Sequence, residues 1–500
     1  MPIKRYVAIK DNTITNAYKE DLTTRATGSN MGASDVLEVF SIYGQASETS
    51  VEKARILIQF PVTDIAASRA AGLIPASGSV KFYLRLFNAE HSETTPSNFT
   101  VKVSSIQHPW NEGVGLDMET YKDLGASNWI SRSVGNTWLT PGGTFYENNL
   151  NFPEATFTFT EGTEDLLVDV SHTVEGDLIN DPANHHGFLV RLDTSFEDGS
   201  QERSYYTKRF FARGSQHFYK RPILEARWDK SILDDRSQIF KSSSLAPSED
   251  NLNSIYLYNK VRGNLKDIPI TADAVVTQLY SSSVDGVPQG QPVSLVTKSG
   301  TQIGGVTHGN ATFITASGGS SALSKGVYRA QFCYDGSETK LYDVWGTSKD
   351  GVFTTLLTGS GFTVKSDQND PTYEAGDVVV NITNLKSSYS KDENVTFKVH
   401  TRDKSWSPNL YTKATNTTPV SLIREAYYKI VRVADNLTVV PYSTGSGPSF
   451  SRLSYGVSGS YFDFDMSNLE SNYLYEISIL RKQDDRYIEQ KEKFRFRVDT

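Results

Sequence analysis

The most regular pattern of apolar and polar positions lies between Ala54 and Phe87. Side chains of a β-strand alternate between its two faces, so a strand with one buried face shows apolar residues at every second position. Two stretches have that alternation, and their apolar positions are Ile56, Ile58 and Phe60 in the first and Val80, Phe82, Leu84 and Leu86 in the second. The small residues between them predict a loop. We therefore expect a strand pair at the centre of an N-terminal β-domain.

Shorter stretches of the same kind recur up to residue 228. They are Tyr6–Ile9, Val36–Phe40, Val101–Ile106, Ala155–Thr160, Leu166–Val170, Phe188–Leu192 and Pro222–Trp228. Turn-forming residues separate them, and no long amphipathic helix pattern interrupts the series. About ten short strands with turns between them are typical of a β-sandwich, and here they predict a jelly roll over residues 1–228. Residues 107–150 are predicted to form a long loop.

Two further β blocks follow the N-terminal domain. A charged, serine-rich stretch at 229–252 predicts a linker, and a polar stretch at 366–377 predicts a second one. The blocks that they delimit, 253–365 and 378–500, are close in size to an immunoglobulin-like domain, which has about 100 residues. The predicted fold class is therefore all-β: an N-terminal jelly-roll sandwich followed by two immunoglobulin-like β-sandwiches.

A leucine followed by a tyrosine at the start of an alternating strand supports the immunoglobulin-like assignment. Leu469 and Tyr475 have the spacing of the tyrosine corner of such sandwiches. Leu323 and Tyr328 repeat the pattern with one residue less between them. We therefore expect the two blocks to be a degenerate repeat, with the two tyrosines at equivalent positions.

Composition excludes several classes of function. The formal net charge of −8 gives no surface suited to a polyanion, so nucleic acid is not an expected partner. Cys333 is the single cysteine, which excludes intrachain disulfides and cysteine-rich metal sites. The N-terminal segment lacks the apolar core of a signal peptide, and no stretch reaches the ~18 apolar residues that span a bilayer. We expect synthesis in the cytosol and no membrane partner.

The best candidates for a contact site lie in the long loop. Trp110, Trp129 and Trp138 carry flat apolar rings that can stack on sugars. Asn111 and Glu112 lie beside the first ring and offer hydrogen bonds to a glycan or a protein partner. The alternative is that the tryptophans pin the loop to the sandwich, and we favour it because tryptophan is mostly buried in proteins.

Other polar groups were weighed for metal binding or catalysis, and no cofactor is expected. The histidines lack the helical spacing of a zinc site; they are His172, His185 and His186. The acidic turns Glu161–Asp165 and Glu197–Asp198 offer oxygen ligands for calcium, but without the alternating spacing of a dedicated calcium loop. The basic, aromatic segment Arg203–Arg213 predicts a strand with exposed cations, or else a contact for an acidic neighbour or a glycan. No nucleophile elbow or phosphate-binding loop is present in the sequence.

The order of short motifs in residues 1–228 resembles the DNRLRE family, jelly-roll modules related to carbohydrate-binding modules. The matching positions are Asp11, Asn30-Met31-Gly32, Leu37-Glu38-Val39, Ala54–Phe60, Leu84, Leu86, Trp110-Asn111-Glu112-Gly113 and Arg221-Pro222-Ile223-Leu224. Pro61 follows Phe60 where that family has an aspartate, so no role of that aspartate is carried over. The segment from Lys10 to Ser47 is similar to the N-termini of large virion structural proteins of tailed bacteriophages, especially those of marine bacteria.

The similarity to virion proteins implies a non-enzymatic structural role in a phage particle. The protein would be a capsid decoration, neck, collar or tail component, located in the virion after synthesis in the host cytoplasm. Its partners would be other virion proteins and further copies of itself. The alternative is a glycan-binding adhesin that contacts host surface polysaccharide, which requires exposed tryptophans in the loop. A third hypothesis is a polysaccharide-degrading enzyme, since related jelly rolls accompany lyases, but the sequence does not identify an acid–base pair.

Overall fold

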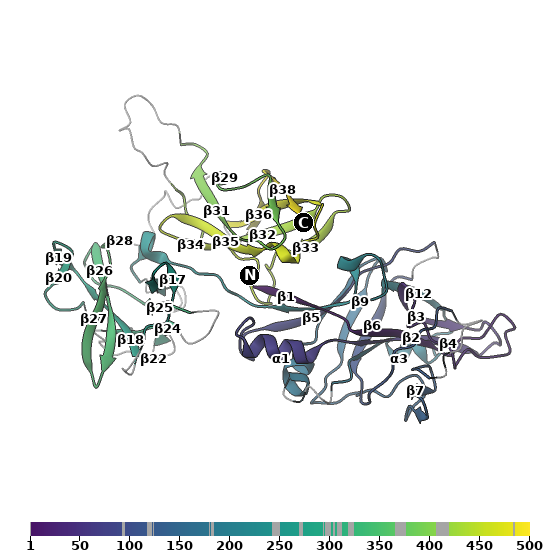
Figure 1. The fold of residues 1–500 in the computed structure, drawn as a ribbon. Helices are drawn as coiled ribbons and strands as arrows, with labels where there is room; N and C mark the ends of the chain where they lie inside the picture. The colour runs from purple at the N-terminus through teal and green to yellow at the C-terminus, as the bar shows by residue number, and fades with distance from the viewer. Residues whose placement is uncertain are drawn as a thin grey trace. The chain divides into compact units, whose positions relative to one another are not determined.

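The computed structural model describes residues 2–500 except 93–95, 118–122, 124, 180, 182–184, 243–250, 270–273, 294, 296–301, 304–305, 308–312, 319–324, 366–376, 407–419 and 484–485. The described chain is built mainly of β-strands, as predicted (Figure 1). It divides into two compact units, Pro2–Trp228 and Asp229–Thr500, which we describe separately. None of the described helices is long and apolar enough to cross a membrane.

Two antiparallel sheets form the N-terminal unit. The first contains, in spatial order, β1 (Ile3–Val7), β13 (Ile223–Arg227), β5 (Lys81–Leu86) and β10 (Leu166–Asp169). The second contains β12 (Tyr205–Phe211), β3 (Val36–Tyr43), β4 (Val51–Gln59), β11 (Phe188–Leu192), β6 (Phe99–Ser105) and β9 (Ala155–Phe159), with β2 (Lys10–Thr15) also paired to β4. The prediction that these two strands pair with each other is therefore wrong, because β4 and β5 belong to different sheets. Their inward side chains are fully buried, as the alternation predicted; examples are Ile56, Ile58 and Leu84.

The segment between β4 and β5, predicted as a loop, contains helix α1 (Val62–Ala70). Asp64 lies in its first turn and Arg69 in its last, which suits the partial charges of the two helix ends. Gly72, with a φ of 68°, follows the helix and allows the chain to turn. The helix therefore occupies the connection along which the chain passes from one sheet to the other.

The first and last strands of this unit lie side by side. β1 pairs with β13 so that Ile3 is opposite Arg227, and the backbone N–H of Trp228 donates to the carbonyl of Pro2 at 3.0 Å. The two ends of the unit therefore meet at one point. The remaining elements are β7 (Ser131–Ser133), β8 (Asn136–Thr137), α2 (Ser171–Thr173), the π-helix η1 (Val174–Leu178), α3 (Thr194–Glu197) and the 3-10 helix η3 (Phe218–Lys220).

The C-terminal unit begins with a stretch that differs from the linker predicted at 229–252. Its described part contains the 3-10 helix η4 (Asp235–Ser237) and β14 (Ile239–Phe240). β14 pairs in parallel with β28 (Phe362–Lys365), so it is the first strand of the second block. Ile239 is fully buried in the core of the second block, so this polar stretch is attached by an apolar side chain, which its composition did not suggest.

The charges of this stretch are paired inside the unit. Arg236 donates to Asp343 at 2.6 Å, and the hydroxyl of Tyr455 donates to Asp235 at 2.8 Å. Charged residues suggested a solvated linker, whereas these contacts hold the stretch against both blocks. The rest of that linker, and all but the last residue of the second predicted linker at 366–377, lie outside the described residues.

The second block also has two sheets. One contains β14, β28, β26 (Lys340–Lys349), β18 (Ala274–Tyr280) and β23 (Ile314–Thr315), with β27 (Val352–Thr358) paired to β26. The other contains β15 (Asn253–Tyr258), β25 (Val327–Phe332) and β24 (Ser317–Gly318). The short hairpins are β16 (Lys260–Val261) with β17 (Asn264–Leu265), β19 (Ser282–Val284) with β20 (Val287–Gln289), and β21 (Gln302–Ile303) with β22 (Val306–Thr307). Asp350 and Gly351 join β26 to β27 with φ values of 51° and 75°, as a tight hairpin turn requires.

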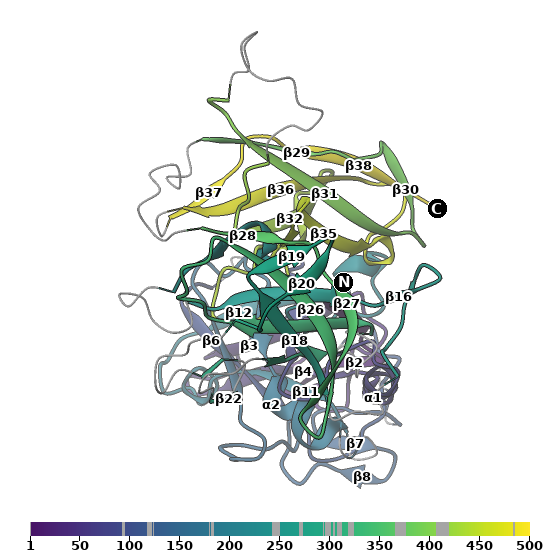
Figure 2. The ribbon, with the colours of Figure 1, turned by 90° about the vertical axis from the view of Figure 1, so that its left-hand side faces the viewer.

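The third block has the strand order of an immunoglobulin-like sandwich. Figure 2 draws several of its strands, from green β29 to yellow β38. One sheet contains β29 (Val378–Ile382), β31 (Asn394–Asp403), β35 (Gly459–Asp465) and β34 (Ser454–Gly456). The other contains β30 (Ser388–Ser390), β38 (Phe494–Asp499), β36 (Leu474–Gln483), β32 (Ala426–Arg432) and β33 (Leu437–Val440), with β37 (Arg486–Glu489) paired to β36. The 3-10 helix η6 (Met466–Asn468) leads toward β36. The hydroxyl of Tyr475 donates to the carbonyl of Glu470 at 2.9 Å, so the predicted tyrosine corner is formed.

The predicted equivalence of the two tyrosines is wrong. Tyr328 lies in β25 and Tyr475 in β36, and these strands occupy different sheets of their blocks. The topological counterpart of β36 is β26. β36 pairs with β38, which pairs in parallel with β30, and β26 pairs with β28, which pairs in parallel with β14. The hydroxyl of Tyr328 instead accepts the backbone N–H of Ile268 at 2.8 Å. Leu323 lies outside the described residues.

Candidate functional site

The three loop tryptophans are buried in the N-terminal unit. Trp110, Trp129 and Trp138 expose 2%, 7% and 4% of their surface. The indole N–H of Trp110 donates to the carbonyl of His186 at 2.8 Å, and that of Trp138 to the carbonyl of Asn128 at 2.9 Å. The side chains that pack with the rings include Ile14, Leu57, Ile106 and Leu189. Stacking of a glycan on these rings requires that the rings are exposed, and they are buried. The alternative, that they pin the loop to the sandwich, agrees with the structure.

Several motifs of the sequence meet in one polar cluster at the start of β2. Glu112 accepts the backbone N–H of Asp11 at 2.8 Å and binds the guanidinium of Arg213 at 2.7 Å. Gly113 is needed here because a Cβ at this position would lie 2.1 Å from Oδ1 of Asn30. These residues are far apart in the sequence, and their contacts fasten the beginning of the long loop to β2.

The surroundings in this cluster change the pKa of the Asp11 carboxyl group. Its side chain is 1% exposed, and its Oδ2 accepts the backbone N–H of Arg213 at 2.5 Å. Burial raises the pKa of Asp11 to about 7, and Glu112 adds to the rise while contacts with Arg213 oppose it. Asp11 therefore takes up a proton near neutral pH.

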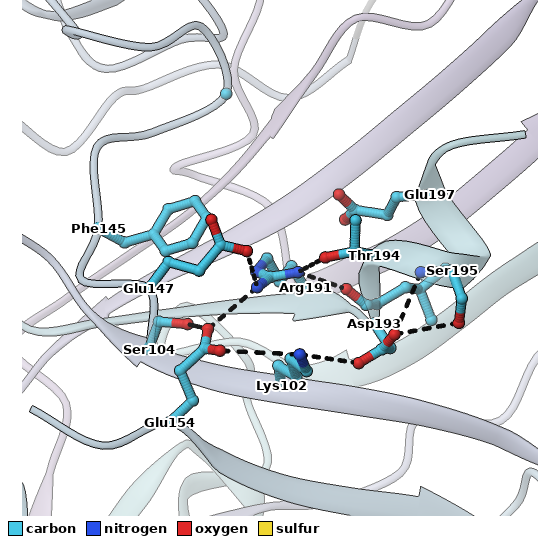
Figure 3. A network of polar contacts seen from close by, with 12 residues as sticks. Lys102, Ser104, Phe145, Glu147, Glu154, Arg191, Asp193, Thr194, Ser195 and Glu197 are labelled. Atoms are coloured by element: carbon cyan, nitrogen blue, oxygen red, sulfur yellow. Dashed lines mark hydrogen bonds and ion pairs between the residues drawn. The ribbon is translucent and has the colours of Figure 1, made fainter. Parts of the chain in front are cut away.

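A second polar cluster holds the end of the same loop (Figure 3). Arg191, on β11, is 1% exposed and donates to Glu147 at 3.3 Å and to Glu154 at 3.0 Å. Its guanidinium lies 4.9 Å from the centre of the Phe145 ring. Lys102 lies 3.7 Å from Oε2 of Glu154, whereas Arg191 binds Oε1 of the same carboxylate (Figure 3). The loop is therefore attached at its beginning, its middle and its end.

Between these attachments the loop presents aliphatic side chains to solvent. Four of them, with their exposed fractions, are Ile130, 40%; Val134, 69%; Leu139, 76%; and Leu150, 94%. The backbone near them is fixed in part by the N–H of Trp138, which donates to the carbonyl of Ile130 at 2.9 Å. Of the residues predicted to make contacts, Asn111 is exposed and Glu112 is half-buried. The exposed surface of the loop therefore includes aliphatic side chains that a partner could cover, and we call these four residues the loop tips.

The other sequence candidates have partners within the N-terminal unit. His185 is 4% exposed, and burial lowers its pKa to about 4. Glu164, in the first acidic turn, accepts three backbone N–H groups of that turn, and Glu197, in the second, binds Arg55 at 2.5 Å. The carboxylates of Glu164 and Glu197 are thus engaged by N–H donors of the chain itself. Within the described part of the chain, no group of three or more histidine, cysteine or acidic residues is placed to hold a metal.

The basic segment Arg203–Arg213 contains β12, as its alternation predicted. Its cations are less exposed than expected. Lys208 is 1% exposed, and Arg209 binds Glu38 at 2.5 Å. The expectation of a strand with exposed cations is therefore wrong for Lys208, which points into the sandwich between aromatic rings.

The C-terminal unit offers an exposed strand edge at β27. Six of its seven residues are exposed, and these include Val352 at 66% and Leu356 and Leu357 at 49% each. β27 pairs with β26 on one side, and no strand of the described chain pairs with its other side. It contains no charged residue and no proline. An uncharged, apolar edge of this kind is a template for pairing with another chain.

Comparison with known proteins gives no family for this chain. No family model matches it, and no curated protein is similar enough to count as a relative. One solved structure that matches is a DUF4785 family protein from Legionella pneumophila subsp. pneumophila str. Philadelphia 1, which is 9% identical. The alignment covers 98% of this chain and 92% of that chain, with a TM-score of 0.13. Two chains with so low a score do not superpose as a whole, so this likeness carries no functional argument.

Proposed function

We propose that the chain is a non-enzymatic structural protein of a tailed-bacteriophage particle, a capsid decoration, neck, collar or tail component that acts through protein–protein assembly. The similarity of Lys10–Ser47 to virion proteins supports the location. The observation that carries the assembly role is the set of exposed aliphatic loop tips on a firmly attached loop. Its partners would be other virion proteins and further copies of the chain.

The attachment of the loop matters for this role as much as its exposed side chains. Exposed aliphatic groups lose contact with water when a partner covers them, at a gain of about 25 cal/mol per Å² of apolar area. A mobile loop would lose conformational freedom in the same step, which weakens binding. The buried tryptophans and the Arg191 cluster hold the loop in place before a partner binds, so the loop loses less conformational freedom on binding.

The two polar clusters also suit a structural role. The Glu112 carboxylate binds Arg213, and Glu154 binds Arg191, so both acidic groups are engaged in holding the loop. The exposed edge of β27 supplies a second surface in the other unit of the chain. A protein with two separate contact surfaces can link neighbours, and a ring or lattice adds many modest contacts into a stable assembly.

The location is tested by identifying the proteins of purified phage particles by mass spectrometry. The expected result is that the chain is present in intact particles in a fixed ratio to the major capsid protein. Its absence from intact particles contradicts the proposal. Incubation of the purified chain with host polysaccharides is the second arm. Cleavage products contradict the non-enzymatic role, whereas binding without cleavage favours the adhesin.

The role of the loop tips is tested with a matched pair of variants. Leu139→Ser removes a tip that is 76% exposed, and Leu73→Ser removes a leucine that is 54% exposed elsewhere in the same unit. Both changes should leave the fold intact, because neither side chain is buried. We expect Leu139→Ser to lower incorporation of the chain into particles, measured by quantitative mass spectrometry, and Leu73→Ser to leave it unchanged. Equal incorporation of both variants contradicts a contact at the loop tips.

A further inference from the structure

The amine of Lys208 has unusual surroundings for a lysine. Its Nζ donates to Oδ1 of Asn88 at 2.5 Å, to the carbonyl of Gly162 at 2.7 Å and to the carbonyl of Glu164 at 2.9 Å. All three acceptors are amide oxygens, and none is a carboxylate. A buried lysine usually has an acidic partner because its charge is costly to bury alone. Here the group in closest contact with the amine is the side-chain amide of Asn88.

Aromatic rings enclose the other side of the amine. Nζ lies 4.8 Å from the centre of the Phe159 ring and 5.3 Å from that of Phe210. Burial lowers the pKa of the Lys208 amine to about 8, so a fraction of it is uncharged at neutral pH. An uncharged lysine amine in an apolar site is a nucleophile.

The carbonyl carbon of Asn88 is within reach of this nucleophile. Because Nζ is 2.5 Å from Oδ1 and a C=O bond measures about 1.23 Å, Nζ and Cγ are separated by at most about 3.7 Å. Reacting atoms held about 3–3.5 Å apart gain several kcal/mol over a reaction between free molecules. Little movement therefore separates the observed contact from a geometry for attack.

We propose that Lys208 and Asn88 form an intramolecular isopeptide bond. The uncharged Nζ attacks Cγ, the new C–N bond forms, and the Cγ–Nδ2 bond breaks to release ammonia. The proton that the ammonium group gives up beforehand leaves with the ammonia as ammonium ion, so no oxidant, reductant or other co-reactant is needed. The Asn88 carbonyl remains as the carbonyl of the new amide.

The carboxylate of Asp165 lies near both residues. Its Oδ1 accepts the backbone N–H of Asn88 at 2.9 Å, its Oδ2 lies 3.6 Å from Arg85, and its charge acts on the Lys208 amine. In the proposed reaction this carboxylate is the group that takes a proton from the amine and returns it to the leaving nitrogen.

The bond would join the two sheets of the N-terminal unit. Asn88 follows β5 of the first sheet, and Lys208 lies on β12 of the second. Asn88 also makes an isolated β-bridge with Phe210, so backbone pairing already brings the two strands together at this corner. With a single cysteine, the chain has no intrachain disulfide for this purpose. The isopeptide bond is a covalent link that does not depend on oxidising conditions.

The test is the intact mass of the purified, full-length chain after denaturation. We expect a mass lower than that of the sequence by one ammonia molecule, and a tryptic digest in which the peptides with Lys208 and Asn88 are joined. Lys208→Arg and Asn88→Ala should each restore the full mass. Lys102→Arg changes a half-buried lysine of the same sheet that is paired with Asp193, and it should keep the deficit.

Three results would overturn the proposal. A wild-type mass equal to that of the sequence excludes the bond. A deficit that persists in Lys208→Arg indicates cyclisation of an asparagine with its own backbone, which releases the same molecule. A digest without the joined peptide excludes the link between these two residues. None of these readouts depends on the stability of the variants, since mass is measured on unfolded protein.

Discussion

The N-terminal unit and the third block are both β-sandwiches, but they hold their sheets together in different ways. The N-terminal unit buries ionised groups: Glu225 lies against Arg5, Arg85 and Arg227 and is fully buried. The third block buries aromatic rings in stacked pairs. Tyr428 and Phe462 are 4.1 Å apart between ring centres, and Phe397 and Phe462 are 5.0 Å apart; their neighbours include Tyr389, Tyr475 and Phe496.

The two interiors should differ in how their stability depends on pH. Burial alone would raise the pKa of Glu225, but Arg5, Arg227 and Arg85 outweigh it and lower that pKa to about 2. Such a cluster stabilises most while each charge keeps its partner, because removing one leaves the others buried without it. Stacked rings carry no charge, and their contribution comes from apolar area and ring geometry. The ionic interior of the N-terminal unit should therefore respond to acid, whereas the stacked rings of the third block should not.

The largest effect should come from placing a new charge among the buried apolar residues of the N-terminal unit. Leu84→Asp puts an unpaired carboxylate on a fully buried position of β5 and should destabilise the unit by more than about 4 kcal/mol. Peptide-resolved hydrogen exchange should show loss of protection in this unit alone. Lys81→Gln, at an exposed position of the same strand, should change stability by less than about 0.5 kcal/mol. Similar losses for the two variants would mean that the face assignment of β5 is wrong.

Removal of a central ring tests the aromatic interior. Phe462→Ala should destabilise the third block by about 3–5 kcal/mol, because it leaves a cavity beside two stacked partners. Calorimetry at several pH values should give the same loss at each of them. Val457→Ala, a nearby position that is 66% exposed, is the control and should be nearly neutral. A loss that changes with pH would show that ionised groups contribute to this interior after all.

Removal of the central charge tests the ionic interior. Glu225→Gln should destabilise the N-terminal unit by about 3–5 kcal/mol at neutral pH, because three arginines lose their shared partner. The pKa of Glu225 is lower in the folded unit than its ordinary value of 4.5. Its stabilisation is therefore complete above about pH 4.5 and is lost as the pH falls toward 2. Acid titration followed by circular dichroism should show this loss in the wild type and a weaker one in the variant.

Asp11 should show the opposite pH dependence to Glu225. Its pKa rises from 3.8 to about 7 on folding, so the folded unit binds a proton more tightly than the unfolded chain. The unit should therefore lose stability from this group as the pH rises from about 4 through 7. Asp11→Asn should flatten that slope while it preserves the shape of the side chain. An unchanged slope in the variant would assign the pH dependence to another group whose pKa rises on folding.

The smallest effect should come from the tyrosine corner. Tyr475→Phe keeps the ring stacked against Phe496 and removes two hydrogen bonds with Glu470, one donated to its carbonyl and one accepted from its backbone N–H. The third block should lose about 1–2 kcal/mol, since the usual net worth of one hydrogen bond is about 1 kcal/mol. Tyr328→Phe, in the second block, removes one bond from a distant backbone N–H and serves as the comparison. A loss well above that of two hydrogen bonds would mean that the corner also fixes the connection into β36.

The sequence predicted the strands better than their partners. Alternation placed Leu84 and Ile58 on buried faces, because burial on one side of a strand leaves a local signature. It could not show that β4 and β5 belong to different sheets, since pairing is decided by long-range contacts. Helix α1 was missed because it has only nine residues and lacks a strong apolar stripe. Charge in 229–252 suggested a linker, and only the folded chain shows Arg236 paired with Asp343.

The candidate site was predictable in part. The position of the long loop and the burial of its tryptophans follow from loop length and from the size of the indole ring. The loop tips were missed because single aliphatic residues in a polar loop form no periodic pattern. The contact of Lys208 with Asn88 could not be predicted, because it joins two residues that are 120 positions apart in the sequence. The pKa values of Asp11 and Glu225 likewise depend on neighbours that the fold brings together.

The adjacent ends of the N-terminal unit determine how it would respond to mechanical force. A pull on Pro2 and Trp228 would act on the β1–β13 pair where Ile3 faces Arg227. When force is applied at the same end of two antiparallel strands, their hydrogen bonds break one after another and do not share the force at the same time. Tension applied between these two ends would therefore detach β1 first, and the other strands of the two sheets would separate later.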